Sequence, residues 1–141
     1  MQSGSKIAFG VVVVAALVAL GAVFVWAPVC DHGVALANGN MMPMRCAYTG
    51  KVGALLSIGI VVVGAVSLAQ KKPGAAGVVA LLVLSCALFL ISFDTPLSIG
   101  VCMADGMACH STATWLRACA AVAFVATIVA ALASPNRKRA A

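Results

Sequence analysis

The sequence predicts an all-α membrane protein that folds as a four-span transmembrane helical bundle made of two hairpins. Hydrophobic residues make up 64% of the 141 residues and charged residues only 9%, which is more apolar surface than a soluble domain of this size can bury. The apolar residues also form long blocks, without the alternation of barrel strands. A bilayer core of about 30 Å needs about 20 helical residues, and we assign the spans to residues 7–27, 52–69, 75–93 and 114–133.

Valine-rich runs such as "GVVVV" in the first block favour strands in water, but a lone strand in lipid would leave its backbone groups unpaired. We therefore expect helices throughout. The short "QKKPG" segment, with Pro73 and Gly74 as helix breakers, predicts a tight turn between the two hairpins. The chain is then a single membrane domain over residues 1–141, with outer loops at 28–49 and 94–113.

The charges predict the orientation of the bundle. Most Lys and Arg residues lie on one side of the four-span layout, and these are Lys6, Lys71, Lys72, Arg137, Lys138 and Arg139. The charges on the other side sum to zero, and these are Arg45, Lys51, Arg117, Asp31, Asp94 and Asp105. The positive-inside rule then favours both termini in the cytoplasm, with the protein in the bacterial inner membrane.

The basic residues at 136–139 lie beside a span, where we expect them to hold the orientation of the protein and to contact anionic lipid headgroups. We therefore expect no nucleic-acid partner. Trp26, Tyr48 and Trp115 all fall at the predicted outer interface, where aromatic side chains anchor at headgroup level. We also considered a signal peptide cleaved near residue 37, but the apolar run is too long for a signal core.

Four of the six cysteines predict disulfides, because they fall in the outer loops, on the oxidising side of the membrane: Cys30, Cys46, Cys102 and Cys109. Three pairings are possible. We favour Cys30–Cys46, which an antiparallel hairpin brings together, and Cys102–Cys109, whose spacer contains a glycine. The pairing Cys46–Cys109 between the loops stays open. The other two, Cys86 and Cys119, lie within spans and are expected to pack as small apolar residues.

The two outer loops share a short pattern. "MRCAYT" at 44–49 and "MACHST" at 107–112 both read M-x-C-x-x-T, each just before an even-numbered span. An internal duplication is one hypothesis for this similarity, and chance is the other. Thr49, and Thr112 or Thr114, are candidate helix N-caps, because a hydroxyl can accept from free backbone N–H groups at a helix start.

Soft ligands gather in the same loops and suggest an alternative metal site. Thioether and imidazole groups suit copper, and the candidates are Met41, Met42, Met44, Met103, Met107 and His110. Cysteines in disulfides cannot be thiolate ligands, however, and methionines in loops also cover helix ends. We therefore expect no cofactor, with copper as the alternative.

Small residues recur at helix-contact spacing in the second and fourth spans and predict close helix packing, either within the chain or against a partner helix. These are Gly53, Ser57, Gly64, Cys119, Ala123, Ala126 and Ala130.

The sequence lacks the residue patterns that are typical of enzymes and pumps. No span has a charge near its midplane, there is no Walker motif, and neither a Ser/His/Asp set nor a carboxylate pair is apparent. Thiol oxidoreductases commonly use C-x-x-C, a spacing that the outer cysteines lack. We expect a protein that is not an enzyme, and we keep thiol–disulfide redox activity as the second alternative.

At "MRCAYTG" and "GVCMADGMACHSTATW" the chain resembles an uncharacterised family of small bacterial four-helix membrane proteins with paired cysteines in both outer loops. The resemblance covers most of the chain in layout and these two loops in motif. This chain has Ala47 where the family often has histidine, which weakens the metal hypothesis. Some members accompany ABC-transporter components, so the resemblance implies an accessory or interaction subunit of a bacterial membrane complex. Its expected partners are the lipid bilayer and a membrane protein or a second copy of itself.

Overall fold

Four helices and one short β-hairpin make up the described part of the chain. The structure is a computed structural model that describes residues 2–29, 33–43, 45–70, 74–93 and 108–133. The elements are α1 (Gln2–Gly21), which continues into the π-helical turn η1 (Ala22–Trp26), β1 (Gly33–Ala35), β2 (Met41–Pro43), α2 (Arg45–Ala69), α3 (Ala75–Leu90) and α4 (Ala108–Ala133).

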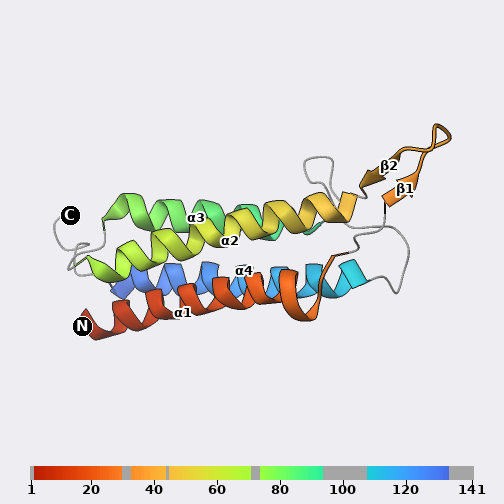
Figure 1. Cartoon of the computed structure of the whole chain (residues 1–141). Helices are drawn as coiled ribbons and strands as arrows, with labels where there is room; N and C mark the ends of the chain where they lie inside the picture. Colours follow the sequence, from red (N-terminus) through yellow and green to blue (C-terminus); the bar gives the residue numbers. More distant parts are fainter. Residues whose placement is uncertain (1, 30–32, 44, 71–73, 94–107, 134–141) are drawn as a thin grey trace.

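The helices form an elongated up-and-down bundle (Figure 1). α1 packs along α2 and α4, and α3 packs along the same two helices, so that α2 and α4 lie across a diagonal and touch at few positions. The β-hairpin projects from the end of the bundle where α2 and α4 begin, and we call this the hairpin end (Figure 1). The expected all-α, four-helix fold is confirmed.

Three of the helices are long and apolar enough to cross a membrane. Ser3–Trp26, Arg45–Ala69 and Ala108–Ala133 contain 24, 25 and 26 residues, with hydropathies of 2.8, 2.4 and 2.2. α3 has only 16 residues; at 1.5 Å per residue it is about 24 Å long, shorter than a typical bilayer core. A span at 75–93 therefore stays a prediction, because the helix gives way to a turn after Leu90.

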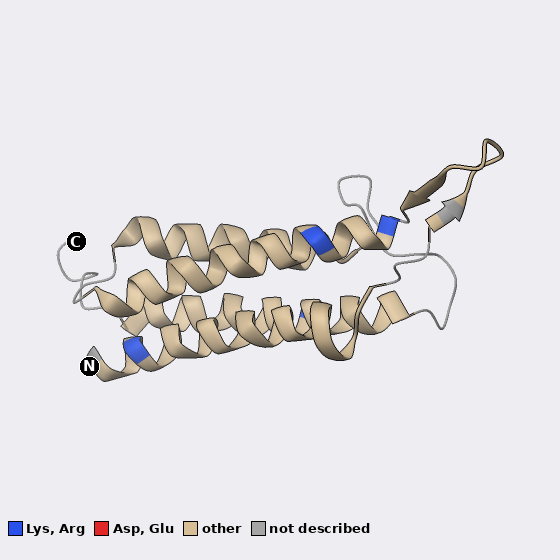
Figure 2. Cartoon of the chain, viewed as in Figure 1, with Lys and Arg blue, Asp and Glu red and all other residues tan. Residues whose placement is uncertain are grey.

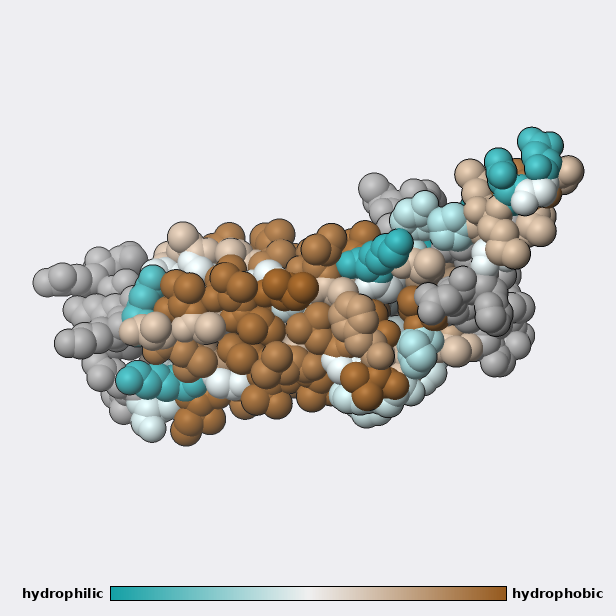
Figure 3. All heavy atoms as spheres, viewed as in Figure 1, coloured by the Kyte–Doolittle hydropathy of each residue, from teal (hydrophilic) through white to brown (hydrophobic). Residues whose placement is uncertain are grey.

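The outer surface of the bundle suits lipid rather than water. Hydrophobic residues cover the middle of the visible face, and hydrophilic residues gather toward its ends (Figure 3). Every helix of the bundle exposes large apolar side chains, among them Val14, Leu55, Val62, Val83, Val125 and Leu132. A monomer in water rarely exposes apolar patches of this extent, so these faces indicate contact with the bilayer.

The interior of the bundle is built from small residues. All the expected packing residues are buried: Gly53, Ser57, Gly64, Cys119, Ala123, Ala126 and Ala130. A Cβ at Gly64 would lie only 2.8 Å from Cγ2 of Val13, so glycine lets α1 and α2 approach closely at this point. At Gly53 a Cβ would lie 3.2 Å from Cδ1 of Leu116, which fills the centre of the bundle from α4.

Buried hydroxyls in the bundle mostly bond to their own helices. Ser57 Oγ donates to the Gly53 carbonyl oxygen at 2.8 Å, and Thr127 Oγ1 donates to the Ala123 carbonyl oxygen at 2.7 Å. Ser92 Oγ also bonds to the backbone four residues before it, donating to the Leu88 carbonyl oxygen at 3.3 Å. Ser85 does not, since its buried hydroxyl has no hydrogen-bond partner among the described residues.

The first outer loop is shorter than expected and contains the β-hairpin, which the sequence analysis did not anticipate. β1 and β2 pair in antiparallel fashion, with Val34 opposite Met42. The turn between them contains the Asn38–Gly39 dipeptide, and Gly39 has φ 76°, a conformation that glycine adopts without strain. The helices also start early, at Arg45 and Ala108, because polar first turns can remain helical outside the apolar span.

Candidate functional site

The two M-x-C-x-x-T elements meet at the hairpin end of the bundle. α2 and α4 each begin one residue before the cysteine of the element, so Cys46 and Cys109 both occupy a first helical turn. The two cysteines are fully buried, and they line one cavity together with Thr49 and Thr112. We call these four residues the Cys–Thr cluster. Elements from opposite halves of the chain therefore form a single site.

The cavity of the Cys–Thr cluster is very small. Its volume is about 10 Å³, which is room for about one water molecule. Its remaining walls are Val29, Gly50, Ala113 and Leu116. A Cβ at Gly50 would lie 2.7 Å from Cγ2 of Val29, so the segment after η1 lies directly against the first turns of α2. The cluster is buried, and a cavity of this size is too small to be a substrate pocket.

The threonines of the cluster lie inside their helices, so the expectation that they are N-caps is wrong. Thr49 Oγ1 donates to the Arg45 carbonyl oxygen at 3.4 Å, four residues back in its own helix. Thr112 Oγ1 donates to the carbonyl oxygens of Ala108, at 3.3 Å, and of Ala27, just past η1. Because the second acceptor is on another element, Thr112 joins α4 to the end of the first span.

Thr114, the other candidate cap, likewise lies within α4. Its Oγ1 donates to the His110 carbonyl oxygen at 2.9 Å, on the exposed side of the helix. The N-cap prediction is wrong for all three threonines for the same reason: the helices start before the expected span boundaries.

The cysteine pairing remains a prediction. No disulfide joins any two of the cysteines within the described ranges, which are Cys46, Cys86, Cys109 and Cys119, so the Cys46–Cys109 pairing is not formed. The favoured pairs Cys30–Cys46 and Cys102–Cys109 each include a residue outside those ranges. Cys119 is buried, as expected for a small apolar side chain, whereas Cys86 is exposed on α3.

Arg117 is half-buried on α4 and binds the end of α3. Its Nη2 donates to the Ser92 carbonyl oxygen, and its guanidinium carbon lies 4.2 Å from the centre of the Phe93 ring. The last carbonyl groups of a helix carry partial negative charge, which a cation stabilises. Arg117 Nε is buried without a hydrogen-bond partner among the described residues. The arginine thus holds the turn that follows α3.

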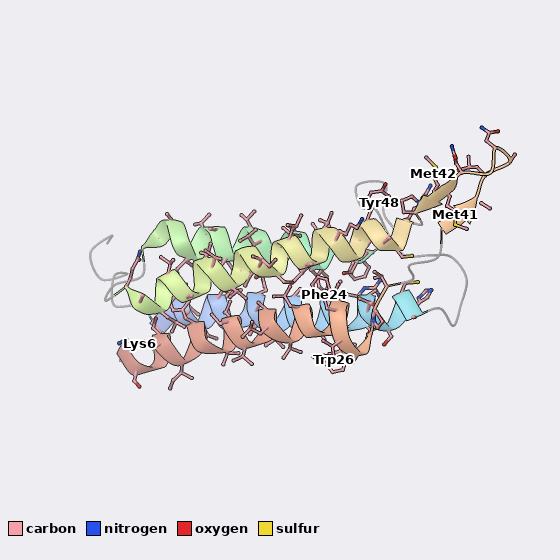
Figure 4. All side chains as sticks on the ribbon, viewed as in Figure 1. Lys6, Phe24, Trp26, Met41, Met42 and Tyr48 are labelled. Carbon is pink, nitrogen blue, oxygen red and sulfur yellow. The ribbon has the colours of Figure 1, made fainter. Side chains whose placement is uncertain are left out.

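The three aromatic residues of the expected outer interface all lie at the hairpin end. Trp26 and Trp115 form an edge-on pair with ring centroids 5.9 Å apart, which joins η1 to α4. Lys51 Nζ lies 5.9 Å from the centre of the Tyr48 ring on α2. Figure 4 shows Trp26 and Tyr48 at this end and Lys6 at the opposite end.

The described candidates for a copper site come from two separate elements. Met41 and Met42 are 76% and 62% exposed on β2, and neighbouring residues of a strand point to opposite faces. His110 is half-buried in the first turn of α4. The remaining candidates, Met44, Met103 and Met107, lie outside the described residues. Within the ranges that the structure covers, no group of three or more His, Cys, Asp or Glu side chains could hold a metal ion.

Comparison with known proteins places the chain in an uncharacterised group. Residues 11–134 match a family model described as a domain of unknown function, DUF4418. No curated protein and no solved structure matches the chain significantly. The match covers most of the chain, including both halves of the Cys–Thr cluster, and it confirms the expected resemblance to a family without a defined activity.

Proposed function

The chain belongs to the DUF4418 family of unknown function, and from this premise we propose that it is a non-enzymatic integral membrane protein serving as an accessory or interaction subunit of a bacterial membrane complex. An ABC transporter is one such complex. The observation that carries the proposal is the small size of the cavity in the Cys–Thr cluster. Its buried cysteine and threonine side chains surround a volume of only about 10 Å³, which is too small for a substrate.

The polar groups inside the bundle support the same proposal. The hydroxyls of Ser57, Ser67 and Thr127 bond to carbonyl oxygens of their own helices, so they offer no chain of donors and acceptors along the interior. Arg117 binds the turn that follows α3. Proton relays and ion paths need ionisable groups that face a wet cavity, and the described interior is packed with apolar residues instead.

In the proposed topology, all four helices cross the inner membrane and both termini are cytoplasmic. The hairpin end, with its aromatic residues, then faces the outer side, where disulfides Cys30–Cys46 and Cys102–Cys109 staple the two loops. Val29 supports the first pair, because it precedes Cys30 in the sequence and lines the same cavity as Cys46. The Lys and Arg distribution supports the orientation.

The test is to find the partner in the membrane. We would place a photo-crosslinking residue at Val62, Val83 or Val125, which are exposed on α2, α3 and α4. An interaction subunit should crosslink strongly to one protein, or to its own copy, from one of these faces and weakly from the others. Native purification in mild detergent should retain the same partner. A chain that stays monomeric and crosslinks only to lipid from all three faces contradicts the proposal.

Copper binding is the alternative function, and the exposed thioethers of Met41 and Met42 favour it. Protein purified without metal stripping should then contain copper, measured by elemental analysis. Replacing Met41, Met42 and His110 by Leu, Leu and Asn should abolish the copper content. Unchanged metal content in the triple variant excludes these residues as ligands.

Thiol–disulfide redox activity is the second alternative, favoured by the placement of Cys46 and Cys109 in one cavity. Such activity requires outer cysteines that cycle between oxidised and reduced forms. Thiol trapping in growing cells should then find both forms. Outer cysteines that stay oxidised throughout growth exclude the cycle.

A further inference from the structure

A second, larger cavity lies beside the Cys–Thr cluster, between η1 and the start of α2. Its volume is about 240 Å³, and we call it the η1 groove. Val23 and Phe24 of η1 form one wall, and Pro28 and Val29 continue it along the segment that follows. These walls are entirely apolar, and the Phe24 side chain is 69% exposed. The η1 groove is therefore open at the surface of the bundle.

Two elements border the space. α2 contributes Ala47 and Gly50, which lie three residues apart on one helix face; the short Ala47 side chain leaves room beside η1, whereas Gly50 packs directly against Val29. The π-helical turn Ala22–Trp26 contributes Val23 and Phe24 on the opposite side. π-helical turns are uncommon and frequently occur at functional sites. The same turn folds Trp26 back against α1, where a Cβ at Gly21 would lie 2.4 Å from the indole ring.

Lys51 lines the η1 groove and is exposed, so it supplies a positive charge at the rim. Arg45 adds a second exposed cation in the first turn of α2. The described residues contain no Asp or Glu, and Figure 2 accordingly shows blue but no red at the start of α2. Each of these two cations can pair with an anion, while the apolar side chains of the walls are complementary to hydrocarbon.

The volume of the η1 groove and its position relative to the membrane interface restrict the class of ligand further. Pockets for drug-sized ligands measure about 300–1,000 Å³, so a volume of about 240 Å³ fits a segment of an acyl chain better than a whole small molecule. Trp26 and Tyr48 lie at the same end of the bundle (Figure 4), and such residues sit at headgroup level in membranes. A ligand at this depth can place its tail in the bilayer and its polar group beside Lys51.

We propose that the η1 groove binds an anionic phospholipid of the surrounding leaflet, with an acyl segment between η1 and α2 and the headgroup phosphate beside Lys51. The proposal depends on a membrane location, but not on the accessory role, because lipid binding needs no protein partner. The acyl chain separates this ligand from free phosphate, which shares only the anionic group.

The test is native mass spectrometry of the full chain released from detergent, with phosphatidylglycerol, phosphatidylcholine or inorganic phosphate added. We expect a retained phosphatidylglycerol adduct, a weaker phosphatidylcholine adduct and no phosphate adduct. Lys51→Ala should weaken phosphatidylglycerol binding about five-fold. Lys6→Ala removes the same charge from the opposite end (Figure 4) and should leave binding unchanged.

Ala47→Phe fills the η1 groove and should reduce both lipid adducts, whereas Val62→Phe adds the same ring on the exposed face of α2 and should not. Equal binding of the two lipids, or equal effects of Lys51→Ala and Lys6→Ala, overturns the proposal. A phosphate adduct as strong as the lipid adduct contradicts the claim that an acyl segment binds between η1 and α2. If Ala47→Phe does not fold, as judged by circular dichroism, the lysine pair still decides the outcome.

Discussion

The guanidinium carbon of Arg117 lies 4.2 Å from the centre of the Phe93 ring, and Nη2 of the same side chain donates to the neighbouring Ser92 carbonyl oxygen. One side chain of α4 therefore stabilises the end of α3 both by stacking and by hydrogen bonding. This contact explains how the shortest helix of the bundle ends in an ordered turn next to α4.

Arg117 and Phe93 should be energetically coupled. We expect Arg117→Met and Phe93→Ala each to destabilise the protein, and the double variant to lose less than the sum, with a coupling of about 0.5–2 kcal/mol. The check is a double-mutant cycle, in which the free energy of unfolding in detergent is measured for the parent protein, the two single variants and the double variant. Strictly additive losses contradict a direct interaction.

Thr112 should contribute more to stability than Thr114, although the two residues are only two positions apart on α4. Thr112→Val removes the hydrogen bond to Ala27 on another element and should cost about 1–2 kcal/mol. Thr114→Val is the matched control, because its hydroxyl is exposed and bonds only to its own helix, and the loss should be near zero. Thermal unfolding of both variants measures the difference, and equal shifts in Tm argue against the inter-helix bond.

Gly64 should not tolerate a methyl group. Gly64→Ala places a Cβ 2.8 Å from Val13 and should destabilise the bundle by about 1–3 kcal/mol. Gly10→Ala makes the same change where no atom lies within 4 Å, and should stabilise its helix by about 0.5–1 kcal/mol. We expect the two substitutions to change the free energy of unfolding in opposite directions. A neutral Gly64→Ala shows that α1 and α2 are less closely packed.

The outer cysteines should be oxidised in protein from native membranes. After unfolding without reductant, an alkylating reagent should modify only Cys86 and Cys119, and modify all six cysteines once reductant is added. Peptide mass spectrometry of the sample without reductant should find the links Cys30–Cys46 and Cys102–Cys109. Alkylation of all six before reduction contradicts the staples, and a Cys46–Cys109 peptide replaces the favoured pairing.

The hairpin turn and the C-terminus should lie on opposite sides of the membrane. A small tag inserted between Asn38 and Gly39 sits in the turn of the β-hairpin, away from the bundle (Figure 1). We expect an impermeant reagent to label this tag in intact cells, and a tag at the C-terminus only after the cells are opened. Labelling of both tags in intact cells contradicts an even number of spans with cytoplasmic termini.

Much of the fold follows from local sequence. Long apolar blocks specify helices in lipid, and glycine, alanine and serine at regular spacing mark the buried faces. The β-hairpin also has a local signal, because Asn-Gly, here Asn38–Gly39, is a preferred hairpin turn, although hydropathy alone does not reveal it. The early helix starts were harder to predict, because the first turns of α2 and α4 are polar and resemble loop sequence when only hydropathy is considered.

The sequence by itself determined the class of protein, the number of helices and the repeated M-x-C-x-x-T pattern, because these depend on composition and on spacing along the chain. Only the tertiary structure showed that Cys46 and Thr49 share one cavity with Cys109 and Thr112, and that Lys51 lines an apolar groove with Phe24. These contacts depend on which helices pack together and on how the helices are aligned along the bundle axis. That choice is made by contacts between residues far apart in the chain, such as Gly50 against Val29 and Thr112 against Ala27.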